Sequence, residues 1–299
     1  MKKSLLSIAI CLLLVAGVLF CLVSCGATKT IESANVNEKG ELILTYTDGS
    51  TENLGVVKGD KGDKGDAGND ENPQGLAFFL KDDGTYVVEM GYAKYLSKIE
   101  IPATYNGKPV TEIGYSAFSN CTSLTSVTIP DSVASIGTNA FRDCTSLTSV
   151  TIPDSVTTIG SHAFHNCTSL TSVTIPNSVT TIGYNAFRDC TSLTSVTIPD
   201  SVTSIDDYAF SVCTSLTSVT IPDSVTNIGT NAFSDCTSLT SVTIPDSVTS
   251  IGQYAFYYCE SLTNIRYRGT KEQWDNIRKD YHWDYKPEQY TITYNYDGE

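Results

Sequence analysis

Hydrophobic and polar residues follow a unit of 23 residues that recurs from Cys121 to Glu260. Its apolar positions fit no single helical period, but residues 126–129 alternate polar and apolar side chains, as in a β-strand with one face inward. Cysteine marks the period, at Cys121, Cys144, Cys167, Cys190, Cys213, Cys236 and Cys259. Such a fixed period predicts a solenoid in which each unit contacts only its neighbours.

The rest of the unit predicts how one strand leads to the next. Pro130 lacks an amide donor and should end the strand, and Gly137 allows a tight bend. Ala140, Phe141 and Cys144 have the spacing of one helical turn. Each unit is therefore predicted to form a strand, a corner, a short extended segment and a helical turn. Stacked units would place their strands about 4.8 Å apart in a parallel sheet.

The pattern L-x-x-V-x-I-P-x-S-V-x-x-I-G-x-x-A-F-x-x-C resembles the BspA-like class of leucine-rich repeats, over about residues 96–267. The resemblance implies a leucine-rich repeat solenoid with a parallel β-sheet on the concave side. With 23-residue units, short helical turns and terminal caps, the array is predicted to have about eight strands, from Leu96 to Leu262. Family members are usually described as cell-surface adhesion or host-interaction proteins. The resemblance therefore also implies a bacterial surface protein that binds an extracellular partner, which is an analogy of fold.

Residues 1–24 have the pattern of a bacterial lipoprotein signal peptide. Lys2 and Lys3 precede a long apolar run that ends in LVSCG, residues 22–26. This ending resembles the lipobox, whose cysteine becomes the lipidated first residue, and it implies a membrane anchor through lipidated Cys25. The apolar run is also long enough for an uncleaved transmembrane helix. Both alternatives place the rest of the chain outside the cell.

Two segments separate the leader from the array. Residues 25–57 carry alternating apolar residues around Asp48 and Gly49, which predicts a β-hairpin. Residues 58–75 include a run with Gly at every third position. This composition favours a flexible charged spacer, with a short collagen-like trimer as the alternative.

The array is predicted to carry a cap at each end. Residues 76–95 form a second hairpin signal, around Asp83 and Gly84, that could cover the first edge of the array. In residues 268–299, Thr270 and Gln273 have capping-box spacing at the start of a short helix, and a closing strand follows. Terminal repeats must hide the open core, so Trp274 and Trp283 are predicted to be packing residues.

The formal net charge of −14 excludes a nucleic-acid partner, because phosphates require a basic surface. Part of this charge forms a column of aspartates at one repeat position. These carboxylates are predicted to be either solvated or bridged by calcium. The column consists of Asp131, Asp154, Asp200, Asp223 and Asp246, with Asn177 at the same position in one repeat.

The repeat cysteines are predicted to fill a buried apolar column and to form neither disulfides nor a zinc site.

The chain carries no recognisable catalytic motif. His162 and His165 flank Phe164 at positions where other units carry different side chains, which suggests exposed and tolerant sites. The many serines follow the repeat, and no nucleotide-binding loop, metalloprotease helix or nucleophile elbow occurs. We therefore expect no enzyme activity, no cofactor and no catalytic metal.

The remaining candidate is the polar face of the predicted strands, an uncharged hydroxyl ladder. Its members are Ser126, Thr128, Ser149, Thr151, Ser172, Thr174, Ser195, Thr197, Ser218, Thr220, Ser241 and Thr243. A periodic surface suits an extracellular protein or glycan, but it lacks the aromatic and arginine anchors of a protein hot spot. The alternative is a soluble strand surface on a structural spacer without a ligand. Variable residues after the Gly and Phe positions, above all Tyr254, Tyr257 and Tyr258, are a lesser candidate.

Overall fold

The computed structural model describes residues 31–36, 41–56, 74–284 and 290–297, which belong to two compact units, residues 1–68 and 69–299. In the first unit, β1 (Ile31–Val36), β2 (Glu41–Tyr46) and β3 (Thr51–Val56) form an antiparallel sheet in that order. The predicted hairpin is confirmed as β2–β3, where Gly49 adopts a left-handed φ of 80°. β1 was not predicted.

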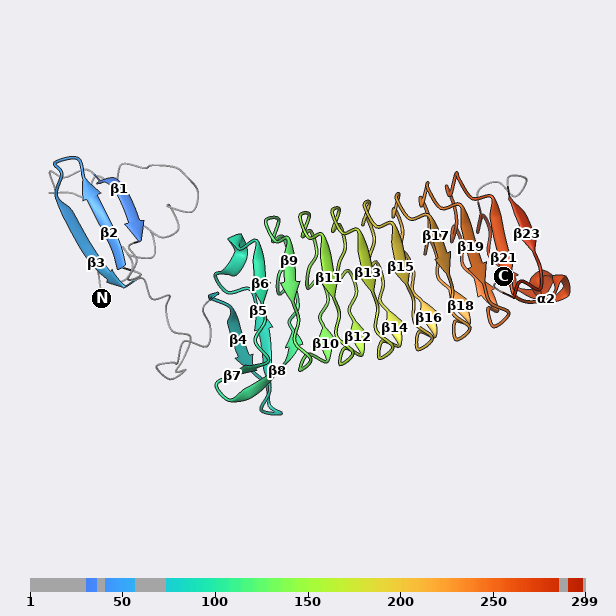
Figure 1. The fold of residues 1–299 in the computed structure, drawn as a ribbon, viewed down its shortest axis with the longest axis horizontal. Helices are drawn as coiled ribbons and strands as arrows, with labels where there is room; N and C mark the ends of the chain where they lie inside the picture. The colour runs from blue at the N-terminus through green and yellow to red at the C-terminus, as the bar shows by residue number, and fades with distance from the viewer. Residues whose placement is uncertain (1–30, 37–40, 57–73, 285–289, 298–299) are drawn as a thin grey trace. The chain divides into compact units, whose positions relative to one another are not determined.

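The second unit is a solenoid with two parallel sheets (Figure 1). The first sheet contains the predicted strands, and in three of its ladders each Ser and Thr lies opposite its counterpart 23 residues away. Its eight strands are β6 (Lys98–Glu100), β9 (Ser126–Thr128), β11 (Ser149–Thr151), β13 (Ser172–Thr174), β15 (Ser195–Thr197), β17 (Ser218–Thr220), β19 (Ser241–Ile244) and β21 (Asn264–Tyr267). The solenoid fold predicted from the repeat is confirmed.

The segments predicted only as extended pieces form a second sheet. Its parallel strands are β8 (Lys108–Ile113), β10 (Ser135–Ile136), β12 (Thr158–Ile159), β14 (Thr181–Ile182), β16 (Ser204–Ile205), β18 (Asn227–Ile228), β20 (Ser250–Ile251) and β22 (Arg278–Lys279). Most are only two residues long, because the Gly-containing bend follows at once. Each inward isoleucine is buried, so both sheets enclose the same core.

The predicted helical turn is instead a pair of tight turns, which form the turn side of the solenoid. Ala140 N donates to Gly137 O at 3.2 Å, but Asn139 and Asp143 adopt left-handed φ angles of 58° and 59°. Asn and Asp tolerate this conformation better than most residues. The Asn139 amide then donates to Ser161 O of the next repeat at 3.0 Å. Bonds between repeats therefore replace the bonds of a helix.

Columns of phenylalanine and cysteine side chains run through the core, beside the buried Leu, Val, Ile and Ala of each repeat. Phenylalanine rings from Phe118 to Phe256 stack with centroids 5.3–5.4 Å apart and interplanar angles of 4–14°. All seven repeat cysteines are buried and free, as predicted for an apolar column. From Cys144 to Cys259, each Sγ donates to the carbonyl of the Phe 26 residues earlier at 3.1–3.3 Å. The column therefore satisfies carbonyl groups as well as filling space.

One repeat, residues 190–212, departs from the regular pattern. Elsewhere a glycine follows the second-sheet isoleucine, and a Cβ at Gly160 would lie only 2.7 Å from Thr138 N of the preceding repeat. Asp206 occupies this position in residues 190–212. The first sheet is also divided here into β6–β15 and β17–β23, since β15 and β17 form no ladder among the described strands. The array is thus least regular in this repeat.

The N-terminal cap extends the second sheet. The predicted hairpin is confirmed as β4 (Ala77–Leu80) and β5 (Tyr86–Glu89), and β5 pairs with β8. The short helix η1 (Ala93–Tyr95) follows. The residues inserted before β8 form another hairpin with β7 (Thr104–Tyr105), turning at Asn106 and Gly107, which have φ angles of 49° and 70°.

The C-terminal cap follows the prediction closely. The helix α2 (Lys271–Asn276) has a complete capping box between Thr270 and Gln273, and Trp274 is buried. Trp283 packs against the same core, which confirms both tryptophans as packing residues. The closing strand is β23 (Thr291–Thr293), which adds to β21 in parallel.

Candidate functional site

The predicted hydroxyl ladder lies on the first sheet, and most of it is exposed. The exposed members are Thr128, Ser149, Thr151, Ser172, Thr174, Ser195, Thr197, Ser218 and Thr220, whereas Ser126 and Ser241 are half-buried. Alternation explains this placement, since the intervening valines point into the core. We call the nine exposed and two half-buried residues the hydroxyl face.

Thr243 does not belong to this surface, contrary to the prediction, because only 6% of it is exposed. Its partner in the adjacent strand is Arg266, where the earlier repeats have threonine. The Arg266 guanidinium lies over the Tyr296 ring, 5.3 Å from its centroid. The C-terminal cap thus limits the hydroxyl face at this end.

The hydroxyls of this face form no side-chain hydrogen bond within the described part of the chain. A neighbouring column of threonines behaves differently, although it is just as exposed. Thr148 Oγ1 donates to Thr125 O at 3.1 Å, and Thr194 Oγ1 donates to Thr171 O at 3.1 Å. A column of serines before the second sheet also bonds internally, as Ser178 Oγ does to Val156 O at 2.5 Å. The hydroxyl face therefore keeps its hydrogen-bonding capacity for water or a ligand.

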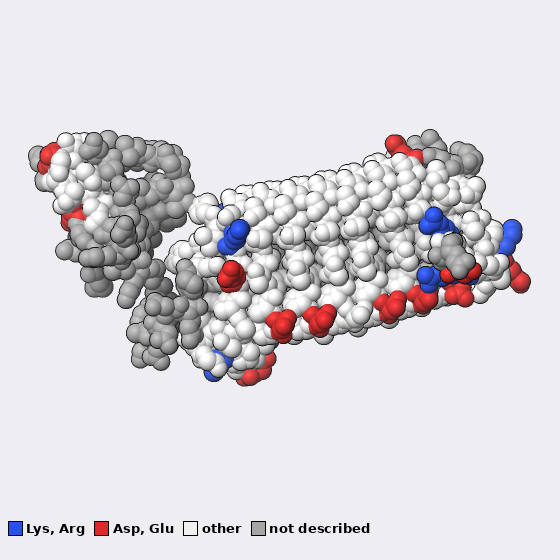
Figure 2. Space-filling model, viewed as in Figure 1, with Lys and Arg blue, Asp and Glu red and all other residues white. Residues whose placement is uncertain are grey.

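The hydroxyl face is uncharged, with charges only at its borders. Figure 2 shows a wide surface without charged side chains and a row of acidic groups along one edge of the array. The aspartates of the repeat position before the second sheet are all exposed. Asp223 forms an ion pair with Arg268 of the C-terminal cap at 2.5 Å. No group of three potential metal ligands occurs among the described residues.

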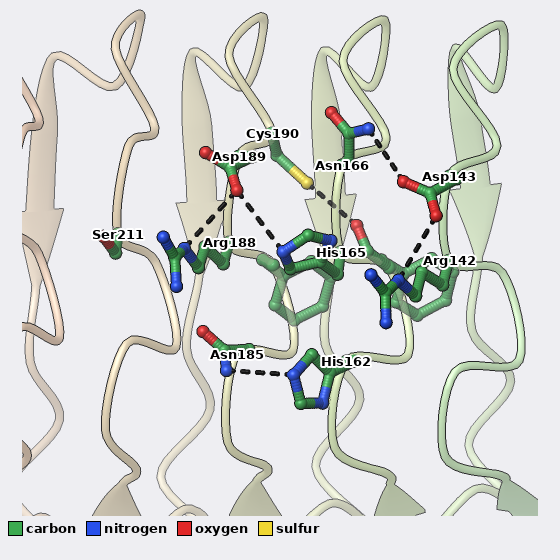
Figure 3. A network of polar contacts seen from close by, with 12 residues as sticks. Arg142, Asp143, His162, His165, Asn166, Asn185, Arg188, Asp189, Cys190 and Ser211 are labelled. Carbon is green, nitrogen blue, oxygen red and sulfur yellow. Dashed lines mark hydrogen bonds and ion pairs between the residues drawn. The ribbon is translucent and has the colours of Figure 1, made fainter.

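A second polar surface lies on the turn side of three successive repeats (Figure 3). Arg142, His165 and Arg188 occupy one repeat position, and Asp143 and Asp189 occupy the next. Arg142 Nε donates to Asp143 Oδ2 at 3.2 Å. Asp189 Oδ2 lies 3.3 Å from His165 Nε2 and 3.4 Å from Arg188 Nε. We call this group, with His162 and Asn185, the basic cluster.

The two histidines are not the exposed sites that the sequence suggested. Both are half-buried, and the Asn185 side-chain nitrogen lies 3.1 Å from His162 Nε2. Burial lowers the pKa of both imidazoles, and the Arg142 charge lowers them further. A signal for the cluster exists in the sequence, because Arg142, His165 and Arg188 are one repeat apart and neighbouring repeats of a solenoid are in contact.

Aromatic side chains continue this surface along the turn side. The His162 ring contacts Tyr184, with centroids 5.2 Å apart, and Tyr184 contacts Tyr208 at 5.8 Å. Arg188 lies over the Tyr208 ring, 5.3 Å from its centroid. The predicted Tyr254 and Tyr257 pack together at 5.0 Å near the C-terminal cap. Tyr184 and Tyr258 are exposed.

The proposed lipidation site, Cys25, and its leader lie outside the described residues, as does most of the spacer at 58–75. Within the described residues, no helix has the length and hydrophobicity needed to cross a bilayer.

Comparisons with known proteins agree with the repeat and the fold. The model of the BspA type leucine rich repeat region matches residues 91–217 and 180–278, with six copies. A leucine rich repeat protein of T. pallidum is 33% identical, with a TM-score of 0.59, over 63% of this chain and 88% of that one. A leucine-rich repeat protein from Bacteroides ovatus is 26% identical, with a TM-score of 0.55, over 73% and 69% of the two chains.

A comparison with curated proteins finds no match. The family assignment therefore depends on the repeat itself, and the matched region includes the repeat strands of both sheets, the phenylalanine and cysteine columns and the start of the C-terminal cap. On this evidence the chain belongs to the BspA type leucine rich repeat family.

Proposed function

We propose that this chain is a lipid-anchored protein of the bacterial cell surface, and that its hydroxyl face binds an extracellular protein or glycan without catalysing a reaction. The observation that carries the proposal is the difference between two exposed hydroxyl columns. One column bonds to backbone carbonyls, whereas the hydroxyl face makes no side-chain hydrogen bond in the described structure. A stabilising role therefore explains the hydroxyls of the first column but not those of the hydroxyl face.

The form of the hydroxyl face supports multivalent contact with an extended partner. Equivalent hydroxyls recur on neighbouring strands in strict register, so a polymer could form the same contact several times. Each neutral hydrogen bond contributes only about 1 kcal/mol, but linked contacts add avidity. The absence of Arg and aromatic anchors from this face favours many weak contacts over one strong one.

The binding test uses residues 69–299, which contain the whole described core of the solenoid. Thr151, Thr174 and Thr197 are replaced by lysine, which puts bulk and charge in the middle of the hydroxyl face. The matched control replaces Thr158, Thr181 and Asn227 by lysine, since these exposed residues lie at equivalent strand positions of the second sheet. Both proteins are compared with the parent on arrays of matrix proteins and glycans.

Saturable binding that is lost in the first variant and kept in the control supports the proposal. Equal binding by both variants would place the partner elsewhere. A folded fragment that binds nothing on either array would favour the structural spacer, whose hydroxyls serve only solubility.

The anchor is tested separately with the full chain. Growth with a labelled fatty acid should label the protein and hold it in the membrane fraction. Cys25→Ala should abolish the label. Persistent labelling of that variant would disprove lipidation at Cys25.

A further inference from the structure

The basic cluster is unusual because the array around it is strongly acidic. Between Cys121 and Glu260 the sequence contains eleven Asp and Glu residues but only two arginines and two histidines. All four basic or imidazole side chains lie in this one cluster, on three successive repeats. At the position of the arginines, later repeats carry Ser211 and Ser234, which are small and buried.

The carboxylates of the cluster lie deeper than the guanidinium groups. The side chains of Arg142 and Arg188 are 44% and 37% exposed, against 26% and 29% for Asp143 and Asp189. Arg142 Nε donates to Asp143, and Asn166 also donates to Asp143 at 2.8 Å. The buried Arg188 Nε lies 3.4 Å from Asp189 Oδ2 and forms no hydrogen bond within the described residues. The Nη atoms of both arginines form no hydrogen bond within the described residues. The acidic groups therefore orient the guanidinium groups and leave their outer ends for a ligand.

The cluster also contains unused acceptors. His165 Nδ1 and Asn185 Oδ1 are buried and have no hydrogen-bond partner. A buried polar group without a partner is destabilising, and a hydroxyl donor on a ligand would satisfy it. Surface ion pairs hold their side chains weakly, so small movements of the arginines would open these atoms to a ligand. A ligand that carries both acidic groups and hydroxyl groups fits this set better than an acidic peptide.

The spacing of the cluster fits a sugar polymer laid along the solenoid. One repeat advances 5.3 Å at the neighbouring phenylalanine column, which is close to the length of one sugar unit in an extended chain. Arg142 and Arg188 are two repeats apart, with His165 between them. The exposed Tyr184 ring, next to His162, adds an apolar surface of the kind that packs on sugar rings.

We infer that the basic cluster is a binding site for an acidic polysaccharide whose carboxylates, on alternate sugars, pair with Arg142 and Arg188. The site lies on the turn side and is separate from the hydroxyl face. The two proposals can therefore fail independently.

The test measures binding of the intact protein, kept in solution with a neutral detergent, to three polymers. Hyaluronate has a carboxylate on every second sugar, dextran is neutral, and polyglutamate is an acidic peptide. Arg142→Gln with Arg188→Gln should weaken hyaluronate binding at least tenfold. The control, Lys108→Gln with Arg278→Gln, makes the same charge change at exposed positions outside the cluster and should bind as the parent does.

Hyaluronate binding with this pattern, together with weaker binding of dextran and polyglutamate, supports the inference. Three outcomes would overturn it: no binding of hyaluronate, an equal loss in the control variant, or polyglutamate binding as tight as that of hyaluronate. Variants of the hydroxyl face should leave hyaluronate binding unchanged.

A pH series tests the histidines as positioning residues. The charged groups that face them are Arg142, Arg188, Asp143 and Asp189, and Tyr184 lies against His162. Burial and the Arg142 charge lower the pKa of both imidazoles, although the Asp189 charge partly opposes the shift at His165. Both histidines therefore gain charge only in more acidic solution. Hyaluronate affinity should therefore rise as the pH falls below about 6.5. His162→Gln with His165→Gln should remove this rise but keep binding at neutral pH, and a rise that persists would exclude the histidines.

Discussion

At the scale of single residues, burial decides the chemistry of the cysteine column. Burial raises the pKa of the Cys190 and Cys236 thiols to about 12, and of Cys121, at the N-terminal end, to about 11. The thiolate is the reactive form, so these cysteines should be inert in the folded protein.

Thiol labelling of residues 69–299 measures this directly. We expect almost no reaction under native conditions and reaction of all seven thiols after unfolding. Cys121 should be the first to react, because its Sγ contacts Met90 Sδ instead of a Phe carbonyl. Rapid native labelling of Cys190 would contradict the packing described above.

Asp206 is the residue whose charge opposes folding most clearly. Burial raises its pKa, and the Asp207 charge adds to the shift. The charged form is therefore disfavoured in the folded state at neutral pH, and the penalty disappears once the carboxyl is protonated. Asp206→Asn should raise the urea midpoint at pH 7, and the gain should shrink as the pH falls toward about 3.9. Asp200→Asn, at an exposed site of the same repeat, should have little effect. A gain independent of pH would mean that charge is not the cause.

At the scale of elements, the sequence predicted those structures whose signals are local. The strand alternation, the two Asp-Gly hairpins and the Thr270 capping box all appeared where expected. The second sheet was missed because two-residue strands carry no alternation of their own and exist only through pairing with neighbours. The turns were misread as helical because the spacing of Ala140 and Phe141 does not reveal the left-handed φ angles beside them.

The cap helix α2 gives a test at this scale. Thr270 Oγ1 accepts from Gln273 N at 3.2 Å, and Gln273 Oε1 accepts from Thr270 N at 2.8 Å. Thr270→Ala removes the first of these and should lower the free energy of unfolding by about 1 kcal/mol. Thr181→Ala is the control, since that exposed threonine makes no side-chain hydrogen bond among the described residues. Equal losses in both variants would mean that the cap adds nothing specific.

The candidate sites were only partly predictable. Alternation located the hydroxyl face, because register alone decides which side of a strand is exposed. It could not show that Thr243 is covered, since Arg266 follows the last regular repeat and departs from its pattern. Prediction of the basic cluster requires that residues one repeat apart be treated as neighbours. It also requires the turn geometry, which leaves His162 and His165 half-buried.

At the scale of the whole molecule, each repeat should be removable as a unit. Deletion of residues 190–212 joins Asp189 to Cys213 in the same register and removes the irregular repeat. The shortened protein should fold, with an unchanged circular dichroism spectrum per residue and a cooperative urea transition. Deletion of residues 190–201 is the control. It breaks the register of both core columns and should prevent folding of the array. If the first deletion unfolds the protein, the irregular repeat is required.

The stacked phenylalanine column has a consequence for inheritance. Because successive rings meet at nearly the same distance and angle throughout, the phenylalanine contact between successive repeats is almost the same along the array. Recombination between the near-identical stretches of the gene would then add or remove whole repeats without disturbing the core. Array length, and with it the length of the hydroxyl face, is then a property that one genetic step can change.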